Sequence, residues 1–216
     1  MKIIKKCPLF EGIDEKDLIS LSECLKASEK SFRKNQFVFH AGDNAVSVGV
    51  VLEGSVHILQ EDYWGNRTII AGIDAGELFA EAFSCAGLNR LPVSVQAAQD
   101  TKILLIDYRR IIYTCSDSCS FHNTLVRNMV SILASKNVFL TQKIEHITQH
   151  TTRDKLLSYF SAQAQRVSAS AFEIPFSRQQ LAEYLSVDRS AMSSELSKMR
   201  DDGIIEYNKN HFELIK

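Results

Sequence analysis

The sequence lacks an excess of charge of either sign. Its 216 residues carry 25 lysines and arginines against 26 aspartates and glutamates, a formal net charge of −1. Such a chain has no basic surface that attracts phosphate by charge alone. The balance holds at the C-terminal end, where nine basic and nine acidic residues follow position 150. If the protein binds nucleic acid, individually placed residues rather than net charge must show it.

Long apolar runs are also missing. No run approaches the roughly 18–20 residues that a membrane span needs, and the first residues lead into Cys7 and Pro8 without the apolar core of a signal peptide. Five cysteines, an odd number at scattered spacing, do not form the disulfide framework of a secreted protein. We therefore expect a cytoplasmic protein with reduced thiols and no membrane partner.

Sequence motifs of catalysis are absent as well. The chain has no nucleophile elbow, no phosphate-binding glycine loop and no zinc-protease motif. Glu81 and Arg90 are suggestive charged residues, but no nucleophile stands beside them. An enzyme is therefore not expected.

Glycine is distributed unevenly and divides the chain. Eight of the nine glycines precede residue 88, and over the same stretch short β-branched or aromatic runs alternate with glycine-containing turns. The runs cover residues 37–39, 48–52, 55–59, 68–71 and 102–106. Several short strands at this spacing predict a β-barrel or a jelly-roll-like β-roll, which we place at residues 1–115.

The middle of the chain has a helical period. No glycine or proline occurs between residues 117 and 147, and apolar residues recur alternately four and three positions apart, as in a coiled coil. This pattern predicts one helix over residues 116–147, about 45 Å long, that pairs with the same helix of a second subunit. Its dimer seam consists of Val126, Val130, Leu133, Asn137, Leu140, Ile144 and Ile147. A core helix buried on all sides is the alternative.

Residues 148–216 are predicted to form a winged helix. The polar stretch 148–152 is a hinge candidate, and a helix over 153–166 and a short strand over 172–176 follow it. Ser177 opens the helix 178–185 with a capping box, and Asp188 caps a second helix over 189–200 after a three-residue turn. Gly203 ends that helix before a hairpin over 204–215. Two such helices and a hairpin fit a winged helix-turn-helix.

The second helix of this motif lies in the major groove of DNA with its N-terminal residues on the base edges. Arg189 suits bidentate pairing with guanine, and helix N-termini hold phosphate. The predicted DNA-binding residues are Ser177, Arg178, Gln179, Asp188, Arg189, Ser190, Ser193 and Ser194. A small packed domain, in a ligand-binding module without DNA binding, is the alternative.

Over almost its whole length the sequence resembles the CRP/FNR superfamily of transcription regulators. The resemblance is carried by residues 39–43 with 51–56, by 76–82 and by 177–205. It implies an α+β fold with an N-terminal double-stranded β-roll of the cyclic-nucleotide-binding jelly-roll type, a long dimerisation helix and a C-terminal winged helix-turn-helix. It also implies a homodimer on pseudo-palindromic double-stranded DNA, a small-molecule effector between β-roll and helix, and RNA polymerase as a partner of an activator.

The resemblance disfavours cAMP as the effector. In cyclic-nucleotide-binding members the motif Phe-Gly-Glu is followed by an Arg-Ser or Arg-Thr pair, whose arginine binds the cyclic phosphate. Here Glu81 is kept, Ala80 replaces the glycine, and the pair falls on Leu91 and Pro92, so that only a shifted loop could bring Arg90 to the phosphate. We expect another small molecule in a pocket bounded by Phe79, Glu81, Arg90, Leu91, Asn137, Val138 and Phe139.

A redox, haem or thiol sensor on the same scaffold is the alternative. The N-terminal cysteine cluster of oxygen-sensing members is absent, and Cys7 and Cys24 lie far apart in the sequence. Cys115 and Cys119, four residues apart, are weak candidates for a metal or thiol site, and burial as small apolar residues is the commoner fate of free cysteine. The cofactor stays unknown, with haem or a cluster left open.

Overall fold

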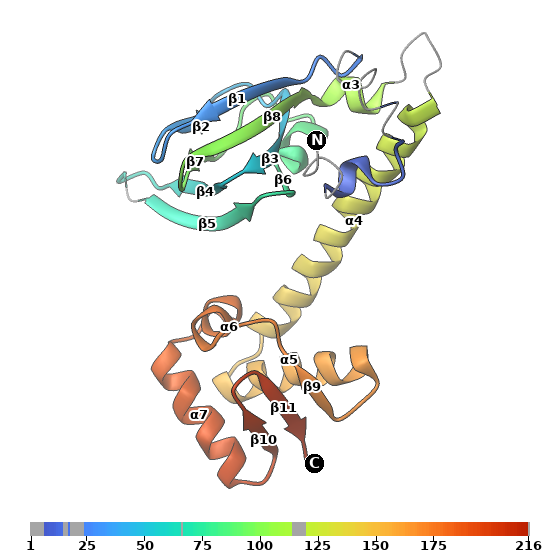
Figure 1. Ribbon diagram of the computed structural model, residues 1–216. Helices are drawn as coiled ribbons and strands as arrows, with labels where there is room; N and C mark the ends of the chain where they lie inside the picture. Colours follow the sequence, from blue (N-terminus) through green and yellow to red (C-terminus); the bar gives the residue numbers. More distant parts are fainter. Residues whose placement is uncertain (1–6, 15–16, 18–23, 66, 114–119, 216) are drawn as a thin grey trace. The chain divides into compact units, whose positions relative to one another are not determined.

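The computed structural model describes residues 7–14, 17, 24–65, 67–113 and 120–215, and it divides into two compact units, Met1–Ala134 and Ser135–Lys216 (Figure 1). Each unit is described by itself. None of the helices in the described residues is long and apolar enough to cross a membrane.

The N-terminal unit contains the predicted β-roll, built from two four-stranded antiparallel sheets (Figure 1). One sheet has the order β1 (Ser28–Phe32), β8 (Thr101–Asp107), β3 (Ser47–Glu53) and β6 (Leu78–Phe79). The other has the order β2 (Phe37–Phe39), β7 (Ser94–Ala97), β4 (Ser55–Glu61) and β5 (Arg67–Asp74). All five predicted runs are strands, whereas β1, β6 and β7 were not predicted. Among the described residues, short helical segments accompany the sheets: η2 (Pro8–Phe10), α2 (Glu81–Cys85) and α3 (Tyr108–Ile112).

Strand β3 is buried on both faces, because its side chains alternate between two apolar clusters. Val48, Val50 and Leu52 point into the cluster that contains Leu9 and Phe10, and Val51 points into the other. Residue 49 of this strand must be glycine, because the ring of Phe79 occupies the space that a side chain would need. A Cβ built on Gly49 would come within 2.0 Å of that ring. The absence of a side chain at residue 49 therefore makes room for the ring of Phe79, one of the predicted pocket residues.

Helix α4 (Ser120–Ile147) confirms the long helix expected in the middle of the chain. Its first turns bury Phe121, Leu125 and Met129 in the cluster of Leu9 and Phe10. The side-chain amide of Asn128 donates hydrogen bonds to the carbonyl oxygens of Leu9 and Glu11, at 2.9 and 2.8 Å. These contacts attach the N-terminal 3₁₀ turn to the helix.

The C-terminal unit contains the predicted winged helix (Figure 1). It consists of α5 (Thr152–Val167), β9 (Ala171–Glu173), α6 (Arg178–Leu185), α7 (Arg189–Asp201), β10 (Ile205–Asn208) and β11 (His211–Leu214). The strands form one sheet in the order β10, β11, β9. Strand β9 ends at Glu173 rather than at residue 176 as predicted, because Pro175 has no N–H group to extend a ladder. Gly203 follows α7 with φ +66°, the left-handed conformation that ends many helices.

Buried rings join the end of α4 to the other helices of this unit. His146 is 3% exposed, and its Nδ1 lies 2.8 Å from the hydroxyl oxygen of Ser158 on α5. Its ring stands edge-on to Tyr159, with 5.6 Å between the centroids, and Tyr159 packs on Tyr184 of α6 at 5.5 Å. Burial lowers the pKa of His146 and raises the pKa of Tyr159 to about 12. Both rings are therefore neutral at pH 7.

The lowered pKa of His146 makes the stability of this unit dependent on pH. The unfolded chain takes up a proton near the ordinary value of 6.5, while the buried imidazole resists it. The free energy of unfolding should therefore be highest above pH 6.5 and fall as the pH drops through the lower pKa of the folded state. The change His146→Asn, which does not titrate, should flatten this dependence in urea unfolding between pH 7.5 and 5.5.

The matched control is His150→Asn, because His150 is exposed in the turn after α4. This variant should keep the pH dependence of the unchanged chain. An identical pH dependence in the His146→Asn variant would show that another group causes it.

Candidate nucleic-acid interface and effector pocket

The start of α6 presents free donors to solvent. The hydroxyl of Ser177 accepts a hydrogen bond from the N–H of Gln180 at 3.3 Å, and the Gln180 side chain accepts one from the N–H of Ser177 at 2.9 Å. This is the predicted capping box. Among the described residues, the N–H groups of Arg178 and Gln179 have no acceptor, as is usual for the first turn of a helix. This end of the helix can hold an anion such as phosphate.

The start of α7 forms an exposed polar face above a buried apolar one. Asp188 caps the helix through a 2.8 Å hydrogen bond from the N–H of Ala191. The predicted contact residues Arg189, Ser190, Ser193 and Ser194 are all exposed. The opposite face packs into the core through Met192, Leu196 and Met199. The helix therefore keeps its position while its polar side chains remain available to a partner.

The Arg178 side chain has a different place from the other predicted DNA-binding residues. Its guanidinium lies 5.0 Å from the ring centroid of Tyr207 and 4.6 Å from that of Phe212, both on the hairpin β10–β11. Nη2 donates a hydrogen bond to the carbonyl oxygen of Lys209 at 2.8 Å. The side chain of Arg178 is therefore engaged by the hairpin, whereas Ser177 and Gln179 are exposed.

An ion-pair network that was not predicted joins the start of α5 to α7. Arg153 Nε lies 2.5 Å from Glu195 Oε1, and Arg153 Nη1 lies 2.8 Å from Asp202 Oδ2. These groups raise the pKa of Arg153, which stays charged. No short-range pattern could have shown the network, because Glu195 is 42 residues away in the sequence.

The β-roll holds four of the predicted pocket residues. The side chains of Arg90 and Leu91, which are neighbours in the sequence, point in different directions. Phe79 and Leu91, each 2% exposed, pack in the same apolar cluster, and Glu81 is buried at the start of α2. Arg90, in contrast, is directed to the loop, where Nη1 donates to the carbonyl oxygen of Gly42 at 2.7 Å. Backbone hydrogen bonds between Leu91 and residues 42 and 43 fix the register of this loop. Leu91 therefore occupies the inward position.

The three predicted pocket residues on α4 lie in the C-terminal unit. Asn137, Val138 and Phe139 are exposed within that unit. The Phe139 ring is tilted against Tyr184 of α6, with 5.8 Å between the centroids. Their contribution to an effector site stays a prediction.

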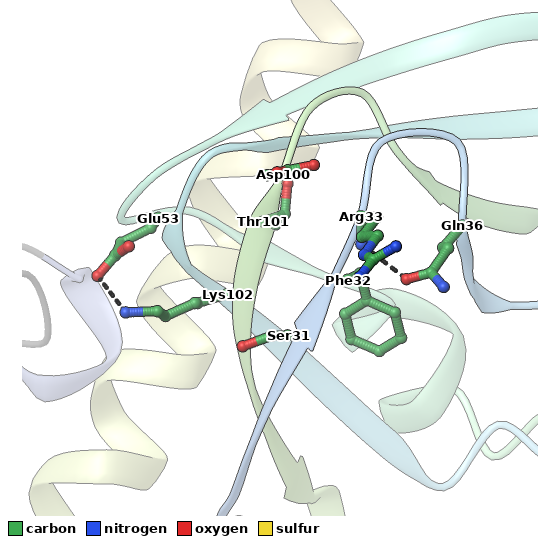
Figure 2. Close-up of a pocket in the computed structure, with 8 residues that line it drawn as sticks. All are labelled: Ser31, Phe32, Arg33, Gln36, Glu53, Asp100, Thr101 and Lys102. Atoms are coloured by element: carbon green, nitrogen blue, oxygen red, sulfur yellow. Dashed lines mark hydrogen bonds and ion pairs between the residues drawn. The ribbon is translucent and has the colours of Figure 1, made fainter.

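A pocket of about 540 Å³, separate from the predicted effector site, opens where β1 leads into the turn before β2 and where β8 begins (Figure 2). Arg33 and Lys102 are balanced there by Glu53 and Asp100. Lys102 Nζ lies 2.9 Å from Glu53 Oε1, and this pair raises the pKa of the lysine. None of the predicted site residues lines this pocket.

Cys115 and Cys119 lie outside the described residues. Within the part of the chain that the structure describes, no group of three or more His, Cys, Asp or Glu side chains could hold a metal ion. Cys7 is fully buried, and burial raises its pKa to about 11, so that it is a thiol at pH 7. Cys24 Sγ lies 3.8 Å from Nε2 of His122, which is buried at the start of α4.

Two family models match the chain, one in each unit. The model of the cyclic nucleotide-binding domain matches residues 29–118, and that of the Crp-like helix-turn-helix domain matches residues 154–216. The first match covers the β-roll with its predicted pocket residues. The second covers the capped helices and the wing.

Relatives of known function align over most of the chain. The transcriptional activator protein anr of Pseudomonas aeruginosa is 24% identical over 197 residues, which is 88% of this chain and 77% of that protein. The transcriptional activator protein FnrA of Stutzerimonas stutzeri is 22% identical over 203 residues, 90% of this chain and 79% of that protein.

Solved structures share the fold at low identity. The c-di-GMP-responsive global regulator CLP of Xanthomonas campestris aligns with a TM-score of 0.56 and 18% identity over 94% of this chain and 100% of that one. A CooA variant from Carboxydothermus hydrogenoformans gives 0.53 and 20% over 90% and 86%. DNR of Pseudomonas aeruginosa gives 0.51 and 19% over 100% and 93%.

Proposed function

We propose how this chain, which belongs to the CRP/FNR family of DNA-binding transcription regulators, carries out regulation. In the proposal it acts as a homodimer on pseudo-palindromic double-stranded DNA. It responds to a small effector other than cAMP. The observation that carries the proposal is the exposed N-terminal face of α7, held in place by its buried apolar face. The proposed role is regulatory, without enzymatic activity. RNA polymerase is a partner if the protein is an activator.

In the proposed complex, Arg189 reads a guanine in each half-site, and Ser177, Gln179 and Asp188 lie near the phosphates and the edge of the groove. The serines on α7 have less capacity to discriminate. Ser193 Oγ already donates its hydrogen to the carbonyl oxygen of Arg189 at 2.9 Å, so that it can only accept from a base amino group. Ser190 and Ser194 are short side chains with one hydroxyl each. Base discrimination should therefore be concentrated at the guanine of Arg189.

The change Arg189→Ala should weaken binding of the dimer to the preferred site by about thirtyfold or more, because it removes two bidentate arginine–guanine contacts that each discriminate by about 1–3 kcal/mol. The preferred site is obtained by selection from random DNA with the unchanged protein, and affinities are compared by fluorescence anisotropy at one salt concentration. Lys198→Ala is the matched control, since it removes an exposed charge near the other end of the same helix. Equal affinities of the Arg189→Ala variant and the unchanged protein would contradict the assignment.

The exposed apolar residues of α4 support the proposed dimer. Val130, Leu140 and Ile144 are 61%, 53% and 57% exposed, although they belong to one regular seam. Val126, Leu133 and Ile147 of the same seam are half-buried. A stripe of large apolar residues on a soluble helix indicates a partner surface, and the alternating spacing suits a second copy of the same helix. The polar Asn137 in this seam would then set the register of the pair.

Replacing a seam residue by a charge should separate the subunits. The change Ile144→Glu places like charges against each other in the proposed coiled coil, and we expect sedimentation to give the monomer mass at concentrations where the unchanged protein is a dimer. The control is Gln142→Glu, which adds the same charge on the side of the helix away from the seam. An Ile144→Glu variant that sediments as a dimer would contradict the proposed interface.

The loop geometry supports an effector without a cyclic phosphate. Leu91 faces inward and Arg90 binds the carbonyl oxygen of Gly42, so that the described β-roll offers no cation at the phosphate position expected for cAMP. Burial of a phosphate against Leu91 would cost several kcal/mol. We propose that the effector contacts Phe79, Glu81 and Leu91 of the β-roll. Native mass spectrometry of the purified protein is the direct check, and retained cAMP would contradict this part of the proposal.

A further inference from the structure

Arg178 contacts three parts of the same hairpin, although it is the first residue of α6. Its guanidinium packs on Tyr207 of β10 and Phe212 of β11, which are paired with each other across the two strands. Its Nη2 donates to the carbonyl oxygen of Lys209 in the turn between them. The side chain therefore joins the start of the helix-turn-helix to the strands and to the tip of the wing.

These contacts bury one side of the guanidinium, while Arg178 as a whole is half-buried. Nη1 is buried and has no hydrogen-bond partner among the described residues. Burial also lowers the pKa of Arg178, which nevertheless remains charged. A buried charge without a carboxylate partner is unfavourable, so its presence calls for a role that the planar guanidinium fulfils. Stacking on two rings while donating to a carbonyl oxygen is such a role.

The residue held by this hydrogen bond has an unusual backbone conformation. Lys209 has φ +53°, in the left-handed region that glycine and asparagine favour in two-residue hairpin turns. Its side chain is exposed and has no ion-pair partner among the described residues. Glu206 and Glu213, paired across the strands and both exposed, make the outer face of the wing acidic. Among the described residues of the hairpin, 204–215, Lys209 is the only lysine or arginine, and it lies at the tip.

We infer that Arg178 is a positioning residue for DNA binding: it holds the tip of the wing so that Lys209 contacts a phosphate beside the site read by α7. Arg178 itself does not contact phosphate through its side chain. This inference rests on the proposed DNA-binding function and adds to it the part of the wing that binds and the residue that places it.

The salt dependence of DNA binding tests the inference. A plot of log K against log salt has a negative slope, and each lost phosphate contact reduces the magnitude of this slope by about 0.9. Because a dimer loses two contacts, Lys209→Gly should reduce the magnitude of the slope by about 1.8. It should also lower the affinity several-fold. Its thermal midpoint should not fall, since glycine adopts the left-handed conformation without strain. Arg178→Met, which keeps a long apolar side chain against the two rings, should give the same change of slope.

The double variant separates positioning from direct contact. If Arg178 acts through Lys209, the Arg178→Met/Lys209→Gly protein should bind no more weakly than either single variant, with the same slope. Losses that multiply, with a further decrease of the slope, would mean that Arg178 contacts phosphate itself and would overturn the inference. An unchanged slope in Lys209→Gly, a variant that relieves strain and so should fold, would overturn it as well.

The same measurements distinguish this inference from the proposed function. Sequence-selective binding that is lost in Arg189→Ala and unaffected by Lys209→Gly would leave the function intact and remove only the role of the wing. A protein that selects no DNA sequence at all would remove both. Lys198→Ala, an exposed charge on α7 away from the wing tip, serves as the control for a general effect of charge.

Discussion

In its first turns, α4 buries Phe121, Leu125 and Met129 in the apolar core of the N-terminal unit, while Leu140 and Ile144 carry the same type of side chain into solvent. The exposed residues belong to the predicted seam that starts at Val126, and the buried ones lie beside it. The first part contributes to folding of the β-roll, and the exposed part is left for another surface. The coiled-coil spacing suits the second α4 of the proposed dimer, and a two-fold DNA site would follow from that pairing.

Charge in the winged helix is used mainly inside the domain. Arg153 binds Glu195 and Asp202, Arg178 packs on the wing, and Arg200 lies 5.4 Å from the ring of Tyr207. Arg189 and Lys209 remain exposed at the ends of α7 and of the hairpin. The neutral total therefore reflects a domain in which several arginines stabilise structure and few are left for DNA. Weak non-specific attraction follows, and binding depends on the placement of those few residues.

In the β-roll, packing rather than charge shapes the proposed effector site. The missing side chain at Gly49 admits the Phe79 ring, and Leu91 joins the same cluster. Regular backbone pairing of the loop keeps Arg90 on Gly42. A ligand at the proposed site would meet an apolar wall and the buried carboxyl group of Glu81, an environment unsuited to an anionic phosphate.

Local patterns in the sequence determined the elements whose signals are local. The coiled-coil period predicted α4, and the caps Ser177 and Asp188 predicted the start of α6 and α7, because a helix depends on residues three and four positions apart. The short strands β1, β6 and β7 escaped prediction, since each is defined by pairing with a distant strand. The destinations of Arg153 and Arg178 were decided only by the tertiary structure. Their partners, Glu195 and Lys209, are 42 and 31 residues away, and a side chain binds whatever the folded chain brings within reach.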